Sequence, residues 1–174
     1  VVPGILREEG ESNAYLVTTP AGNVVIDPGG ARASDSALRA AAGKAPLRAV
    51  IVTHGHDDHR LGIEVWRGGG DAPVIAHAGL AEFVAYHDML SGFFTRRVTA
   101  QAGREVRVPA DDAGSRVLPT VTFADRHDLE VGGLHLEVVQ TPGETPDAAT
   151  VWVPELGAAF VGDLVFGAFP ALYT

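Results

Sequence analysis

Short apolar runs separated by turn-forming clusters predict a series of strands along the chain. Residues 14–18 and 23–27 are rich in strand-forming residues, and the cluster Thr-Pro-Ala-Gly at 19–22 between them predicts an antiparallel hairpin. Residues 48–52 form a nearly unbroken apolar run, which is typical of a strand covered on both faces. Further strands are expected at residues 73–77, 121–124, 134–141, 148–153 and 158–162.

Helical spacing of apolar residues appears between these strands. It predicts helices at residues 34–43, 59–67 and 79–90. The first of them starts at a capping serine and stops at a glycine. Residues 91–119 show little periodicity and are expected to form a long insert or lid. Hairpins at both ends and strand–helix alternation in the middle predict a layered α/β or α+β sandwich, which occupies residues 1–174 as one domain.

Composition agrees with a globular domain and excludes several functions. The 174 residues are 46% apolar and 20% charged, and no apolar run approaches the ~18 residues that a membrane span needs. A net charge of −9 disfavours nucleic acid as a partner, and the absence of cysteine excludes disulfides and thiolate metal ligands. The chain begins at Val1 and shows no basic segment followed by an apolar one, so we expect a piece of a longer protein and favour a cytoplasmic location.

Residues 53–59 contain three imidazoles and two carboxylates directly after a predicted buried strand. In an extended loop, side chains two residues apart point to the same side, so His54 and His56 can hold one ion while the glycine between them allows a tight backbone path. Asp58 and His59 follow one helical step away, and two pairs of ligands suit two ions. Imidazole and carboxylate without thiolate suit zinc or another borderline divalent ion. Such a site holds a hydroxide at neutral pH, the nucleophile of metal-assisted hydrolysis.

The sequence HGHDDH at residues 54–59 resembles the H-x-H-x-D-H signature of the metallo-β-lactamase superfamily. Residues 12–15 and 25–29 look like the opening hairpin of that fold, in which the aspartate that ends the strand lies beside the metal loop. Residues 141–146, TPGETP, are similar to the family's TPGHTP turn, and the pair at 162–163 is similar to its G-D pair. The resemblance covers nearly the whole chain. It implies an α+β fold, a four-layer αβ/βα sandwich with the metals at one edge of its inner sheets.

The resemblance also implies a site for two divalent ions, with zinc expected and iron or manganese as alternatives. The ligands of the first ion would be His54, His56 and Glu144, and those of the second Asp58, His59 and the bridging Asp163. Asp58 is also the residue expected to take part in catalysis. Asp27 and Thr53 are expected behind the ligands, because ligating histidines usually donate their other N–H to a fixed acceptor.

Glu144 stands where most members of the family have a histidine, and this replacement resembles the alkylsulfatase-like branch of bacterial hydrolases. Residues 167–174 are similar to the segment that follows the bridging ligand in that branch, although the branch bridges with glutamate and this chain has Asp163. The family adds one histidine from a later strand, for which this chain has no residue, so the C-terminal part of the fold and site is expected to be missing. The implied substrate is a small alkyl sulfate or related ester. A lactone, a thioester and a β-lactam are the alternatives.

A non-catalytic metal-binding domain, or a fragment of a larger protein, is the alternative from another class. A nuclease is disfavoured by the charge, and an iron-based oxygen reductase by His56, where such proteins carry glutamate. The remaining histidines are expected to be ordinary packing or surface residues: His77, His87, His127 and His135. The arginines of the 91–119 segment are expected to be solvated rather than to face an anionic substrate.

Overall fold

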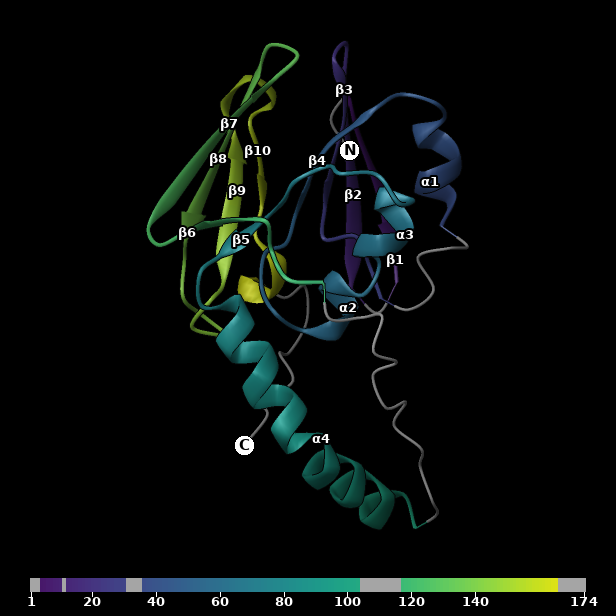
Figure 1. Ribbon diagram of the computed structural model, residues 1–174, viewed down its shortest axis with the longest axis vertical. Coiled ribbons are helices and arrows are strands. Elements are labelled where there is room, and N and C mark those ends of the chain that lie inside the picture. The colour runs from purple at the N-terminus through teal and green to yellow at the C-terminus, as the bar shows by residue number, and fades with distance from the viewer. Residues whose placement is uncertain (1–3, 11, 31–35, 104–116, 166–174) are drawn as a thin grey trace.

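The structure is a computed structural model that describes residues 4–10, 12–30, 36–103 and 117–165. Its strands form two sheets that face each other (Figure 1). One sheet has six strands in the order β1-β2-β3-β4-β5-β6, and the other has four in the order β10-β9-β8-β7. The expected two inner sheets are therefore confirmed.

The six-stranded sheet joins an antiparallel part to a parallel part. Its strands are β1 (Ile5–Glu9), β2 (Asn13–Thr19), β3 (Gly22–Ile26), β4 (Leu47–Ile51), β5 (Val74–His77) and β6 (Val121–Phe123). The first three pair antiparallel, and the predicted hairpin closes where Thr19 pairs with Gly22. Strands β3 to β6 run parallel, so their carboxyl ends meet at one edge of the sheet. Strand β4 lies between two parallel neighbours and is buried at Ala49, Val50 and Ile51, as its apolar run predicted.

The four-stranded sheet is antiparallel throughout. Its strands are β7 (Arg126–Val131), β8 (Leu134–Gln140), β9 (Ala149–Val153) and β10 (Ala158–Phe160). Gly132 and Gly133 form the two-residue turn between β7 and β8 with φ values of 57° and 86°. Tight hairpin turns need positive φ at such positions, and glycine adopts it without a Cβ clash.

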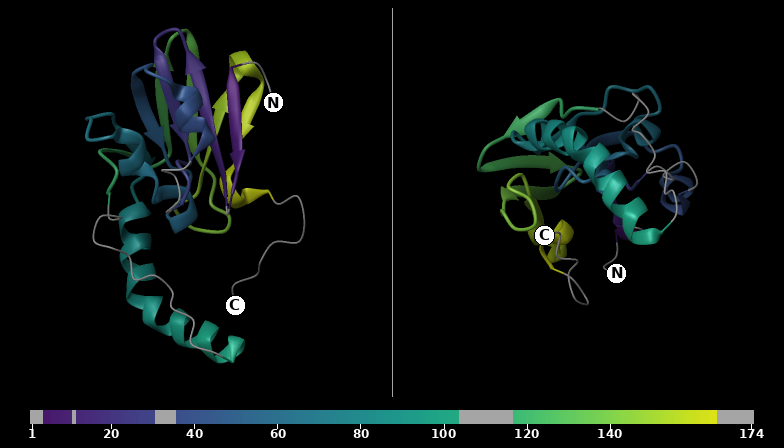
Figure 2. Two further views of the ribbon diagram at one scale, coloured as in Figure 1. Left: turned by 90° about the vertical axis from the view of Figure 1, so that its right-hand side faces the viewer. Right: turned by 90° about the horizontal axis from the view of Figure 1, so that it is seen from below.

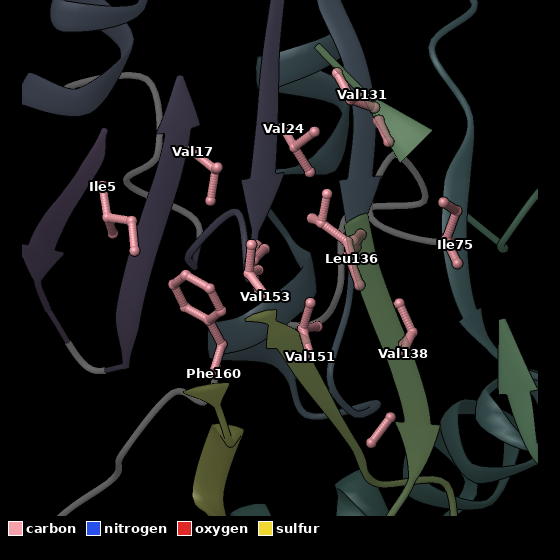
Figure 3. Close-up of a cluster of buried hydrophobic side chains, with 14 of the residues drawn as sticks. Ile5, Val17, Val24, Ile75, Val131, Leu136, Val138, Val151, Val153 and Phe160 are labelled. Carbon is pink, nitrogen blue, oxygen red and sulfur yellow. The ribbon is translucent and has the colours of Figure 1, made fainter. Parts of the chain in front are cut away.

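Most of the core lies between the two sheets (Figure 3). The first sheet contributes Val17, Val24, Ile51 and Ile75, and the second contributes Leu136, Val138, Val151 and Val153. Each fully buried aliphatic side chain contributes roughly 1.5–3 kcal/mol through the hydrophobic effect. A second core cluster, which includes Leu38 and Trp66, packs helices against the other face of the first sheet.

The helices follow the parallel strands of the first sheet. They are α1 (Ala37–Ala42), α2 (Asp57–Arg60), α3 (Ile63–Arg67) and α4 (Leu80–Ala102), with 3-10 turns η2 (Pro154–Leu156) and η3 (Gly162–Leu164). Helix α4 extends away from the sandwich, as two views show (Figures 1 and 2). Within the described ranges no helix covers the outer face of the second sheet, where Trp152 is 38% exposed. None of the described helices combines the length and apolar character that crossing a bilayer requires.

Several predicted boundaries are wrong. The helix expected at 59–67 begins at Asp57 and is divided between α2 and α3. The helix expected to end at residue 90 continues to Ala102, so the first part of the expected insert is helical. One internal glycine costs a helix only about 1 kcal/mol, and the actual end is Gly103, whose φ of 60° is the left-handed conformation of a C-terminal cap. Residues 34–35 and 104–116 lie outside the described residues, and a lid role for 91–119 stays a prediction.

Candidate metal centre

The proposed ligands lie at the edge of the molecule where the parallel strands end. His54 and His56 follow β4, and His59 lies in α2. Glu144 comes from the loop between β8 and β9, and Asp163 from η3, which follows β10. The Ala149 N–H donates a 2.8 Å hydrogen bond to the Thr53 carbonyl, which ties β9 to the end of β4. In Figure 1 this region lies at the lower end of the sandwich, where α2, η3 and the start of α4 gather.

One cluster of ligand atoms comprises His54, His56 and Glu144. Nε2 of His54 lies 3.0 Å from Nδ1 of His56, and these two nitrogens lie 3.4 and 3.3 Å from Glu144 Oε2. All three ligand atoms fall within 4.8 Å of one another. The structure thus brings together the residues predicted for the first ion, including the glutamate in the position of the family's histidine.

A second cluster comprises His54, His59 and Asp163, again with ligand atoms within 4.8 Å of one another. His59 Nε2 lies 3.2 Å from Asp163 Oδ1. Asp58 Oδ2 is 3.6 Å from the same nitrogen, but Asp58 belongs to neither three-ligand cluster. Five of the six predicted ligands are therefore clustered, while Asp58 stands at the margin.

Asp27 and Thr53 lie behind the imidazoles, where a support for the ligands was predicted. Asp27 accepts hydrogen bonds from the Thr53 amide and hydroxyl, each 2.8 Å long, and lies 2.9 Å from His59 Nδ1. The Thr53 hydroxyl lies 3.1 Å from His54 Nδ1. If both imidazoles carry their proton on Nδ1, both Nε2 lone pairs are directed to the clusters.

The electrostatics of the site favour a cation. Burial, together with the charge of the neighbouring His59, lowers the pKa of His54 to about 4, so His54 is a neutral donor. Burial also opposes charge on His59, but the carboxylates of Asp27, Asp163 and Asp58 outweigh burial and raise its pKa to about 10. Contact with His59 lowers the pKa of Asp163, and burial raises that of Glu144. Without an ion, a proton on His59 supplies the positive charge that these carboxylates attract.

The ligand groups fit a divalent ion. His59 Nε2 is buried and makes no hydrogen bond of normal geometry, although buried polar atoms are usually paired. The donor set is nitrogen and oxygen without sulfur, which suits zinc and neighbouring borderline ions. Its carboxylates offset the positive charge of such an ion.

Two residues of α4 reach the site and were not predicted there. The Phe83 ring contacts the His56 ring edge-to-face with centroids 5.2 Å apart, and the His87 ring is 6.0 Å from the His56 ring. A Cβ on Gly55 would lie 2.5 Å from Phe83 Cδ1, so the glycine in the metal loop makes room for this ring. His87 therefore packs near the site through its ring but belongs to neither ligand cluster, and its role stays a prediction.

None of His77, His127 and His135 belongs to either ligand cluster. His135 pairs with Asp128 on the second sheet, and His127 stacks near Phe123. Arg96 and Arg97 are exposed on α4, whereas Arg104 and Arg107 lie outside the described residues.

A mixed sheet with nitrogen and carboxylate ligands at its carboxyl edge, faced by a second sheet that supplies two more carboxylates, defines a metal-binding α/β protein. The sequence pattern described as "Metallo-beta-lactamase superfamily" matches residues 7–173, and the chain belongs to that family. Its His-rich cluster is the candidate metal site of a metallo-hydrolase of this superfamily.

The proteins similar to this chain carry names that indicate different substrates. The chain is 26% identical to "Probable metallo-hydrolase YqgX" of Bacillus subtilis (strain 168), over 90% of this chain and 67% of the relative. It is 23% identical to "Linear primary-alkylsulfatase" of Pseudomonas sp. (strain ATCC 19151), over 80% of this chain but only 31% of the relative. The structure of BLEG-1 B3 metallo-beta-lactamase matches with a TM-score of 0.65 at 20% identity, over 93% of this chain and 73% of that one. These likenesses support the fold and the hydrolase class, and leave the substrate open.

Proposed function

We propose that this chain holds two divalent ions, with zinc as the expected metal, and hydrolyses a small ester-like substrate. The observation that supports the proposal is the pair of adjacent ligand clusters around His54. Because one imidazole nitrogen binds one ion, His54 is assigned to the first ion, and Asp58, 3.6 Å from His59 Nε2, is the further ligand for the second. When bound, two such ions supply Lewis acidity and lower the pKa of a coordinated water. The arrangement of the chain's own residues determines where that chemistry takes place.

The residues divide into ligands and supports. His54, His56 and Glu144 would hold one ion, and His59, Asp58 and Asp163 the other, with Asp163 between them. Asp27 and Thr53 keep the imidazoles oriented, because a fixed acceptor on Nδ1 leaves Nε2 as the ligand atom. Asp58, at the margin and 30% exposed, is the carboxylate best placed to accept a proton from water near the second cluster.

An alkyl sulfate or related ester is the substrate class we favour. Glu144 at the family's histidine position supports it, as does the likeness to an alkylsulfatase. A carboxylate in place of an imidazole adds negative charge beside the ion and lowers its Lewis acidity, which suits a substrate with a good leaving group. A lactone, a thioester and a β-lactam remain alternative substrates.

The test is metal content by elemental analysis, followed by a hydrolysis screen of alkyl sulfates, lactones, thioesters and β-lactams. We expect about two ions per chain, a loss of at least one in His56→Ala, and turnover of one ester class that disappears in the same variant. Asp71→Asn, an exposed carboxylate elsewhere, is the matched control and should retain both. Two ions without turnover of any class would contradict the proposed activity.

A non-catalytic metal-binding role is the second candidate. The observation that favours it is the position of Asp58, which lies outside both three-ligand clusters and would leave the second ion weakly held. One ion per chain and no hydrolysis in the same experiment would support this alternative.

A further inference from the structure

A cleft of about 310 Å³ opens beside the candidate metal centre, at the start of α4. It is lined by His77, Gly79, Glu82, Phe83, Tyr86, Pro146 and Asp147. Its volume is at the lower end of the ~300–1,000 Å³ range of small-molecule sites. None of the residues that line it is a predicted metal ligand.

The cleft shares two walls with the metal centre. Phe83 lines it and also contacts the His56 ring. Pro146 and Asp147 belong to the same loop as Glu144 and follow it within three residues. A substrate whose reacting group lies at the metal ligands can therefore extend its other end into this cleft.

Asp147 is a buried carboxyl group whose oxygens have no hydrogen-bond partner in the described part of the chain. Its side chain is only 2% exposed. A buried carboxylate without a partner is unfavourable, because water that solvated it has been removed. Such a group makes the potential in the neighbouring cleft negative, since the field of a buried charge is weakly screened.

The rest of the lining suits a positively charged group with an apolar body. Phe83 and Tyr86 offer aromatic faces, which attract cations through their quadrupole. Glu82 adds a second carboxylate at the exposed side of α4. Among the described lining residues no lysine or arginine is present. The Gly79 N–H donates a 3.0 Å hydrogen bond to Nδ1 of His77, so the backbone anchors the His77 ring.

We propose that this cleft binds an ammonium group, so that the preferred substrate carries a cationic nitrogen at the end remote from the bond that is cleaved. That the bound molecule is a substrate rests on the proposed hydrolysis, but binding in the cleft can be measured without turnover. Its sharpest rival is a structural role for Asp147, because a Cβ on Gly55 would lie 3.2 Å from Asp147 Oδ2 and the carboxylate thus borders the metal loop.

The experiment compares benzylammonium with benzyl alcohol, two probes of nearly equal size that differ in charge. Each is titrated into the metal-loaded full chain, and binding is followed by amide chemical shifts in NMR. We expect benzylammonium to bind about tenfold more tightly, with shifts centred on Phe83, Tyr86 and Asp147. Asp147→Asn should reduce that preference to about twofold or less while metal content stays unchanged, whereas Asp71→Asn should leave it intact.

Two outcomes would overturn the proposal. One is equal affinity of the wild-type protein for both probes. The other is an Asp147→Asn protein that loses metal but keeps the preference, which would make Asp147 a support of the metal loop.

If Asp147→Asn does not fold, Tyr86→Leu takes its place in the comparison, because Tyr86 is 57% exposed. That variant should weaken benzylammonium about threefold and benzyl alcohol hardly at all, and an unchanged ratio would contradict the proposal. Failure to hydrolyse any ester bears on the proposed function, not on this binding result.

Discussion

At the scale of single residues, Asp27 orients two imidazoles, that of His59 directly and that of His54 through the Thr53 hydroxyl. It accepts from Thr53 and lies 2.9 Å from His59 Nδ1, and its own φ is +50°. Asparagine tolerates this backbone conformation well, so Asp27→Asn tests the carboxylate with little added strain. We expect the variant to bind zinc about 10–100-fold more weakly, because one acceptor oxygen becomes an NH₂ donor. A competition titration against a chromogenic chelator measures the change.

The exchange Asp71→Asn is the control for that variant, since Asp71 is exposed. It removes the same charge from the chain, so any general electrostatic effect on zinc affinity appears in both variants. Equal weakening in the two would sink the orienting role of Asp27.

The residues of the candidate metal centre differ in how far the sequence alone predicts their positions. The HGHDDH segment could be predicted as a ligand cluster because a single loop carries it, and the support by Asp27 and Thr53 could be predicted from the family resemblance. Phe83, His87 and Asp147 could not. Their place depends on how α4 and the loop after β8 cross the metal loop, and no spacing in the sequence encodes that crossing.

At the scale of elements, the hairpin of β7 and β8 carries an exposed charge network. Hydrogen bonding to Asp128 raises the pKa of His135, and hydrogen bonding to Arg126 with help from His135 lowers the pKa of Asp128 to about 2. The raised pKa of His135 contributes stability that is fully present below about pH 6.5, and this contribution is lost as the pH rises through the pKa of the folded state. A lowered aspartate pKa stabilises it above about pH 4 and is lost as pH falls towards 2. The contact is therefore fully effective between about pH 4 and 6.5.

A proton NMR titration of the His135 ring tests this network. In Asp128→Asn we expect the pKa of His135 to return towards its ordinary value, because the principal acceptor of its proton is gone. Glu130→Gln is the matched control, since the Glu130 carboxylate lies 3.7 Å from Nδ1 and its removal should have a smaller effect. A larger fall in Glu130→Gln than in Asp128→Asn would show that the assignment of the partner is wrong.

Turn chemistry and apolar runs predicted most elements, and the two strands that were missed share a physical reason. Strands β1 and β7 stand at the edges of their sheets, and their sequences, ILREE and RHDLEV, are rich in charge. Charged edges discourage pairing with other chains, but they also hide the alternation that marks a strand. Only the partner strands, β2 and β8, show that these segments are extended.

At the scale of the whole molecule, the strand order could not be predicted from local pattern. Strand β6 pairs with β5 across a sequence separation that includes all of α4. The second sheet then places Glu144 and Asp163 opposite a loop that lies about 90 residues or more before them in the sequence. Only the family resemblance predicted that approach, since a pattern of apolar residues carries no information on which sheets face each other.

The separation of core and site leads to a prediction about metal removal. The core between the sheets contains none of the proposed ligands, so the fold should persist without ions and lose only the energy of binding them. An ion present at about 100 times its dissociation constant adds roughly 2.7 kcal/mol, which for a chain of this size corresponds to about 5–10 °C in Tm. Calorimetry of zinc-loaded protein with and without a chelator should show this fall, with unchanged far-ultraviolet circular dichroism at 25 °C.

Glu144→Ala, which lacks one ligand of the first cluster, should show a smaller fall in Tm on metal removal. Complete unfolding by the chelator at 25 °C would mean that the sheets depend on the ions, and no change in Tm would mean that the site holds none.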